Sequence, residues 1–571
     1  MNSTVVPTPP TLEAQDAAGV PDLGQARWWS RDRPRRRLLF LAEAIVAFVA
    51  CLLLPVLVRH LDVNPMNRIG QVSGLAAIQL GFALAGIAAL AGLLMGQWLR
   101  GGIFFEIAIR LSCAALAGLA SGFVAAGAVV SLLGTPWPMF GLNGDTGRLV
   151  AWATSILHGH GDPTPLYPPL SLYGLAGLAK VFYAGNVAYA FKGMEILGAA
   201  VIGPLAYLAW RMLFRPMWAL VIGVVPMMAL IDSYKPYDAV VLILLPPVLG
   251  ALLRAVRRSP GEDWPALLVR AAGLGLLLAV LFLTYSGWFV WSAGGVAAAV
   301  LLLFPWRSGR SGRLRGLAVA GTSAAAFLLV AGWYAVILLR SAGTPDRNFS
   351  FDVYTDPAYF SMWRTDMPGV VTQWPPPGEI GGVSVFTALL FVALGVTLWL
   401  GLRRSVVVAT ACIFASAWLM RLFFAARMYS TGEVELWIRT DNELLYCGLV
   451  FIGLAVYLLA ARLVEARAAL SRPPGGEGSG AGDRGLRPGL PLRGPAVIGA
   501  FAGLLMLAGS MGSSQSDRYM PADVPTYQIF TYVSHTVRML NGRCPQYAPH
   551  GQCSKDGDQK WKSFIYVGPK P

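Results

Sequence analysis

The stretch LLFLAEAIVAFVACLLLPVLV, residues 38–58, carries a single charged side chain among apolar ones and decides the fold class. A helix needs about 20 such residues to cross a hydrocarbon core of about 30 Å. Similar runs recur along the chain into the low 500s. Only 13% of the residues are charged, against about 25% in soluble domains. The sequence therefore predicts a polytopic membrane protein and excludes a soluble enzyme.

The arginines between the apolar runs predict the topology. Residues 1–37 end in a cluster of arginines, so the positive-inside rule places this arm in the cytoplasm. Alternation from there predicts about 13 transmembrane helices and an external C-terminus. Two alternatives stay open: a cleaved secretory signal at the N-terminus, and a further span at 173–184 in place of an interfacial helix.

The predicted fold is an all-α bundle of these transmembrane helices with a short extracytoplasmic C-terminal tail. Its segments are a disordered cytoplasmic arm (1–37), a transmembrane core (38–461), a cytoplasmic linker (462–494), a last transmembrane helix (495–511) and a small extracytoplasmic tail (512–571). Because the cytoplasmic turns hold little besides arginine, a functional site is expected in the external segments of the core, which are 134–186, 232–238 and 340–380.

The net charge of +15 mainly reports this topology. Most arginines lie in short segments between apolar runs and not on one soluble face, so nucleic-acid binding is not expected. Two cysteines, Cys544 and Cys553, stand nine residues apart in the polar tail. An external tail predicts a disulfide between them, whereas a cytoplasmic tail would leave two free thiols.

Asp145 is the candidate catalytic residue, within Gly141–Arg148 after the third apolar run. A carboxylate at the outer membrane surface can accept the proton of an attacking sugar hydroxyl while a lipid phosphate leaves. The structural alternative is an N-cap, since Asp145 precedes a helix-like stretch and aspartate is a common cap.

Aromatic side chains in proline-stiffened loops are candidates to bind a sugar acceptor. Tyr167 precedes two prolines and Trp374 precedes three, although most external aromatics belong to the interfacial belt. The predicted acceptor-binding set is completed by Trp363, His158 and His160. The two histidines with Asp162 have only a loosely metal-like spacing, so no metal site is predicted.

External cations are scarce, and a lipid phosphate needs cationic partners at the outer interface. Lys192, Lys235 and Arg421 are the candidates. Snorkelling into water is the alternative for the lysines. Arg421 is preferred, because a charge within a predicted membrane helix is costly and is functional by default.

Several strings in residues 130–300 resemble the galactan arabinofuranosyltransferase family, GT-C enzymes of actinobacterial cell-wall synthesis. These strings are Asp145-x-x-Arg148, Tyr167-Pro168-Pro169, Phe191-Lys192, Tyr234-x-Pro236-Tyr237 with Leu245-Pro246-Pro247, and Thr284-Tyr285. The resemblance implies transfer of arabinofuranose from decaprenylphosphoryl-arabinose to a galactan acceptor, by an inverting mechanism and with no required cofactor or metal. It implies that Asp145 is the base, and that Arg148, Lys192 and the loop with Tyr234, Lys235 and Tyr237 bind the donor.

The sequence departs from the family at two places. Lys235 stands beside Pro236 where the family leads us to expect an acid, and the external tail holds only about 60 residues where the family has a large domain. A different acceptor polymer or another polyprenyl-phosphate sugar therefore stays open.

Two other functions compete with a glycosyltransferase in a bacterial cell membrane whose active site faces outside. A transporter or flippase of a lipid-linked sugar would share the many helices and external aromatics. Transporters usually show paired halves and charges near the midplane, and the sequence shows no internal repeat. A non-catalytic scaffold for wall synthesis is the third possibility.

Overall fold

The computed structural model describes residues 33–98, 102–161, 164–341, 379–380, 383–431, 440–470, 494–524 and 526–562. In these residues the chain is almost entirely helical. The exceptions are an antiparallel hairpin of two short strands, β1 (Glu379–Ile380) and β2 (Val383–Ser384), and the largely irregular tail, in which Val537 and Ser554 form an isolated β-bridge. The predicted arm (1–32 of it), most of the 462–494 linker and most of the 340–380 loop lie outside the described residues.

Ten helices in the described part are long and apolar enough to cross a membrane, so the prediction of a multi-pass membrane protein is confirmed. They are α2 (Arg33–Val58), α3 (Arg68–Trp98), α4 (Gly102–Ser131), α7 (Val187–Arg211), α10 (Pro236–Arg258), α11 (Trp264–Thr284), α13 (Gly309–Arg340), α16 (Ser405–Thr431), α17 (Thr440–Leu470) and α18 (Gly494–Asp517).

Three shorter apolar segments alternate with these helices along the chain. Two are single helices, and the third is interrupted by a π-helical turn. They are α12 (Gly287–Leu303), α15 (Val385–Gly401), and the run α8 (Pro216–Ala219), η1 (Leu220–Val224) and α9 (Val225–Met228). Counting them as crossings gives the predicted 13, and that finer count stays a prediction.

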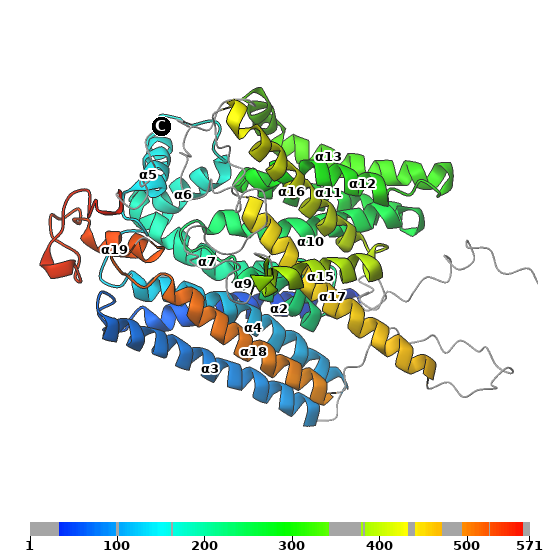
Figure 1. The fold of residues 1–571 in the computed structure, drawn as a ribbon, viewed down its shortest axis with the longest axis horizontal. Helices are drawn as coiled ribbons and strands as arrows, with labels where there is room; N and C mark the ends of the chain where they lie inside the picture. Colours follow the sequence, from blue (N-terminus) through cyan, green and yellow to red (C-terminus); the bar gives the residue numbers. More distant parts are fainter. Residues whose placement is uncertain are drawn as a thin grey trace, which may run out of the picture.

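The remaining elements lie near the ends of the bundle. α5 (Gly144–Leu157), α6 (Pro169–Phe182) and α19 (Gln528–Thr536) lie together at one end, here called the site end (Figure 1). α6 is shorter than a membrane span and packs against α5 and α7. The opposite end, called the arginine-rich end, holds the 3-10 turn η2 (Ser259–Gly261); a second such turn, η5 (Pro549–Gly551), lies in the tail.

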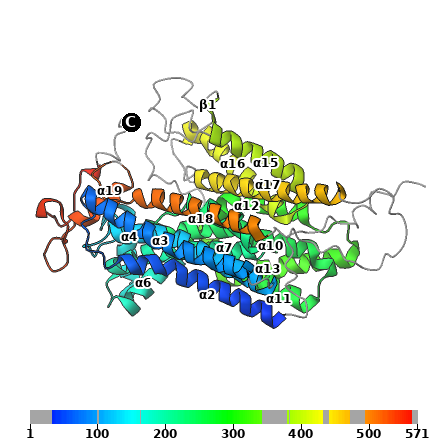
Figure 2. The ribbon, with the colours of Figure 1, turned by 90° about the horizontal axis from the view of Figure 1, so that it is seen from below.

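Glycines let the first helices approach closely. α2 and α4 form the most extensive helix pair, and a Cβ at Gly118 of α4 would lie 2.2 Å from the carbonyl oxygen of Ala47 in α2. A side chain there cannot be accommodated without moving a backbone. Figure 2 shows α18 running alongside α3, which it contacts. The last of the long helices therefore packs against the first ones.

Glu43 of α2 is fully buried and links α2 to α4 and α7. Its Oε1 accepts a hydrogen bond from Arg110 Nη1 at 3.2 Å. Arg211 donates from Nε to Oε2 at 2.7 Å and from Nη2 to Oε1 at 3.1 Å. The Tyr207 hydroxyl donates to Oε2 at 3.0 Å. One carboxylate thus compensates two guanidinium groups, in an interior where a charge without its partner is strongly destabilising.

The C-terminal tail packs onto the loop that follows α4. Trp137 donates from Nε1 to the carbonyl of Val537 at 3.0 Å, and Phe140 donates from its backbone to the carbonyl of Phe530 at 2.7 Å. A disulfide joins Cys544 to Cys553 and closes the loop between them in the tail. The tail is therefore part of the site end and not a separate lobe.

Buried His535 makes this packing sensitive to acid. Its Nε2 lies 2.9 Å from the carbonyl of Ser131, and burial lowers its pKa to about 4. The unfolded pKa is about 6.5, so the unfolded chain binds the proton first as the pH falls. The stability that depends on neutral His535 is complete above about pH 6.5 and is lost progressively toward about pH 4.

We expect the thermal unfolding midpoint of the tail to fall between pH 7 and pH 5, and to fall less in His535→Gln, which has no charge to gain. Hydrogen exchange of the amides of residues 526–562, followed against temperature at each pH, measures unfolding of the tail separately from that of the bundle. An identical pH dependence in the wild type and the variant would assign the effect to other groups.

Candidate active site at the site end of the bundle

Asp145 lies in the first turn of α5 and is not its N-cap. The cap position belongs to Asn143, and the helix begins at Gly144. The N-cap alternative is therefore wrong. The position still favours a carboxylate, because the helix dipole is positive at its N-terminus.

Lys235 forms an ion pair with Asp145 through Nζ and Oδ2. The Asp145 side chain is 48% exposed and that of Lys235 is 18% exposed. The Asp145 carboxylate is thus held by a cation and is still accessible to solvent. Lys235 is also the N-cap of α10, where backbone N–H groups and the dipole favour an anion. Lys235, which stands where the resemblance led us to expect an acid, is thus the residue that contacts the candidate base Asp145.

A buried loop, residues 231–235, fixes Lys235 in place. Asp232 Oδ1 accepts hydrogen bonds from the backbone N–H of Tyr234 at 2.9 Å and from the Tyr519 hydroxyl at 3.3 Å. Burial raises the pKa of Asp232, and the charges of Lys235 and Arg518 oppose that rise. Because Tyr519 follows α18, the C-terminal segment supports the loop.

Tyr234 joins this loop to the turn that carries Asp145. Burial raises the pKa of its hydroxyl, and hydrogen bonding with the neighbouring Thr146 opposes that rise. Its ring packs against Phe530 of the tail at 4.9 Å between centroids, and against Phe140 at 6.4 Å. Tyr234 therefore contributes to the wall of the site.

Tyr167 and Tyr237 are brought together by the fold. Their hydroxyl oxygens lie 2.5 Å apart, which links the loop before α6 to the first turn of α10. Trp152 packs against Tyr167 at 5.4 Å and Tyr285 lies 6.5 Å from Tyr237, between ring centroids. An aromatic cluster thus lies in the first turn of α10, two residues after Lys235, and such rings can stack on sugars.

Glu195 is a supporting residue that sequence reasoning missed. It is fully buried in α7 and its Oε2 accepts from the backbone N–H of Met139 at 2.9 Å. The Met139 carbonyl in turn accepts from the Thr146 hydroxyl at 3.0 Å. Glu195 therefore fixes the loop next to Asp145. Its signal was available, because an acid inside an apolar run is costly and rarely incidental.

Lys192 supports the same loop from one turn away. Its Nζ donates to the carbonyls of Leu132 at 2.9 Å and Thr135 at 2.6 Å. These bonds satisfy the half-buried ammonium group of Lys192 without any ligand. Its predicted contact with a lipid phosphate stays a prediction.

Arg421 is buried in α16 and paired with Asp441 at the start of α17. It also donates to the Thr440 hydroxyl at 3.3 Å. Asp441 thus compensates the charge of Arg421, so that charge does not by itself require a ligand. Its role in donor binding stays a prediction.

The other predicted residues are more peripheral. Arg148 is exposed one turn along α5 from Asp145. His158 follows the last residue of α5, and its Nδ1 lies 2.8 Å from the carbonyl of Thr154. The rings of His158 and His160 are 6.4 Å apart, so both lie at the opposite end of α5 from Asp145.

Trp363, Trp374 and Asp162 lie outside the described residues. Within the described ranges, no three His, Cys, Asp or Glu side chains are grouped to hold a metal ion. No family model matches the chain, and no curated protein matches its sequence.

Proposed function

We propose that the protein is a membrane glycosyltransferase of the GT-C type that moves arabinofuranose from decaprenylphosphoryl-arabinose to a galactan acceptor. The observation that carries the proposal is the half-exposed Asp145 carboxylate paired with Lys235 at the end of a membrane bundle. A base for the acceptor hydroxyl and a cation for the leaving phosphate are the two groups that this transfer needs.

The reaction follows from these two side chains. An acceptor hydroxyl attacks the anomeric carbon of the donor, and its proton passes to Asp145. The bond from that carbon to the phosphate oxygen breaks on the opposite face, which inverts the configuration. The polyprenyl phosphate leaves with its negative charge against Lys235 and the first N–H groups of α10.

In this mechanism Lys235 changes partner. It holds Asp145 before the donor binds, and it turns toward the phosphate once that anion arrives. We expect the half-buried ring of Tyr167 to stack on the acceptor sugar, and the hydroxyl of the buried Tyr237 to hold that ring in position. The positive-inside rule places this end of the bundle outside the cell membrane.

Replacing Lys235 by glutamine is expected to weaken binding of a polyprenyl-phosphate analogue by about tenfold or more, because a charge-assisted contact to the phosphate is lost. Calorimetric titration of the purified protein measures this. Lys180→Gln is the matched control, since Lys180 is an exposed lysine of α6 at the same end. Equal affinities in wild type and Lys235→Gln would place the donor phosphate elsewhere.

A transporter of a lipid-linked sugar is the second candidate, favoured by acids buried within the helices. Glu443 of α17 is 1% exposed and accepts a hydrogen bond from Ser292 of α12. Such residues often line transport pathways. Liposomes separate the two functions: a transferase forms a new glycosidic bond with donor and acceptor on one side, whereas a transporter moves intact donor across the bilayer.

A further inference from the structure

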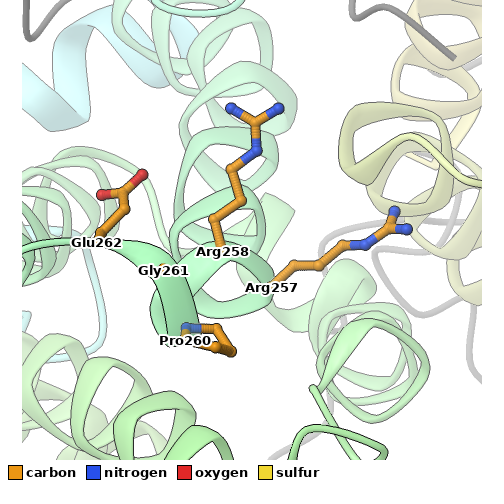
Figure 3. Close-up of a pocket in the computed structure, with 5 residues that line it drawn as sticks. All are labelled: Arg257, Arg258, Pro260, Gly261 and Glu262. Carbon is orange, nitrogen blue, oxygen red and sulfur yellow. The ribbon is translucent and has the colours of Figure 1, made fainter. Parts of the chain in front are cut away.

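An open surface cavity of about 370 Å³ lies at the arginine-rich end, at the other end of the bundle from Asp145. It is lined by Arg257 and Arg258 at the end of α10 and by Pro260, Gly261 and Glu262 in the following turn. Figure 3 shows both arginine side chains extending from the helix, with the Glu262 carboxylate on the turn beside them.

Contacts with one helix and one other turn hold the segment that lines this cavity. Arg315 of α13 donates from Nη1 to the carbonyl of Glu262 at 3.0 Å and to that of Pro260 at 3.4 Å. Arg257 donates to the carbonyl of Arg403, in the turn between α15 and α16. Helix α13 and the turn between α15 and α16 therefore contact the segment 257–262, which alone lines the cavity.

The charge around the cavity is strongly positive. The Glu262 carboxylate accepts two hydrogen bonds from Arg270 Nη1, at 3.3 and 3.0 Å. In the segments 254–270, 305–315 and 402–405 the acidic residues are Glu262 and Asp263, whereas the arginines are Arg254, Arg257, Arg258, Arg270, Arg307, Arg310, Arg313, Arg315, Arg403 and Arg404. This surplus favours an anionic ligand.

Tryptophans mark the depth of the cavity in the membrane. Trp264 begins α11 and is 40% exposed, and the Arg315 guanidinium lies 5.5 Å from its ring centroid. Trp306, after α12, is 57% exposed. Tryptophan is enriched where the headgroups meet the hydrocarbon, so the two rings place the cavity at headgroup level.

We propose that this cavity binds the phosphate of an anionic membrane lipid in the leaflet at the arginine-rich end. Arginine clusters at helix ends report topology in many membrane proteins. Here two arginines also line a cavity whose lining segment is held by contacts with α13 and with the turn between α15 and α16, and guanidinium groups match phosphate oxygens in geometry as well as charge. Basic pockets between transmembrane helices bind phospholipid headgroups in this way. The inference is independent of the proposed transferase activity.

Native mass spectrometry of the full chain, with phosphatidylglycerol or phosphatidylcholine added to the detergent, tests the site. We expect phosphatidylglycerol to bind more tightly, and Arg258→Gln to weaken its binding by about fivefold. Arg258→Lys keeps the charge but not the guanidinium geometry, so it should recover only part of the affinity. Arg310→Gln is the control, because Arg310 is exposed on the same end and does not line the cavity.

Three results would overturn the proposal. Equal binding of the two lipids would show that charge is not recognised. An equal loss in Arg310→Gln and Arg258→Gln would assign binding to the general field of this end. Competition by inorganic phosphate at the concentration of the lipid would show a site for free phosphate instead. Unchanged unfolding midpoints in the variants, measured alongside, exclude loss of fold.

Discussion

Asp145→Asn is expected to abolish sugar transfer while leaving the fold intact, with the rate reduced about 10²- to 10⁴-fold, as for loss of a general base. Asparagine has the same shape and cannot accept the proton. The initial rate with lipid-linked arabinose and a galactan acceptor measures the effect in purified protein. Asp517→Asn is the matched control, because Asp517 is an exposed carboxylate at the end of α18.

Donor binding separates the base from a merely structural residue. Asp145→Asn removes the anion that holds Lys235, so the variant should bind a polyprenyl-phosphate analogue at least as tightly as the wild type. A dead variant that has also lost donor affinity would mean that Asp145 shapes the site and is not its base. A variant with wild-type transfer rates would refute the mechanism.

Glu43→Ala should produce the largest loss of stability, about 3–5 kcal/mol, because it leaves Arg110 and Arg211 without their shared carboxylate in a buried position. The thermal unfolding midpoint in detergent measures the loss. Glu106→Ala is the control. Glu106 also pairs with Arg110, at 2.8 Å, but its side chain is 59% exposed, so its removal should cost about 1 kcal/mol or less.

Similar midpoints for the two variants would contradict this assignment. They would mean that water or a neighbouring residue compensates the two guanidinium groups. A lipid phosphate in the proposed cavity could not replace the Glu43 carboxylate, because that cavity is lined by Arg257 and Arg258 and not by Arg110 or Arg211.

The membrane fold could be predicted from sequence because each helix must by itself supply enough apolar residues to cross the bilayer. The predicted run at 38–58 falls within α2, for example, and the structure extends it toward the N-terminus. The shorter segments are less certain from sequence. The 216–228 run is broken by a π-helical turn, which no apolar pattern indicates.

The candidate site was only partly predictable. Asp145 and Lys235 were both singled out, but as separate groups, because their pairing depends on how the 231–235 loop meets α5. No role was predicted for Glu43 or Glu195, although a lone acid in an apolar run calls for a partner. The role of the tail in supporting the loops was also hidden, since contacts such as Trp137 to Val537 join residues 400 positions apart.

A structure of the full chain with a bound polyprenyl-phosphate sugar analogue tests the central claim most directly. The account predicts the phosphate against Lys235 at the start of α10, and the anomeric carbon placed so that an attacking hydroxyl reaches Asp145. A phosphate seated instead at the Arg421–Asp441 pair, with the sugar out of reach of Asp145, would contradict it.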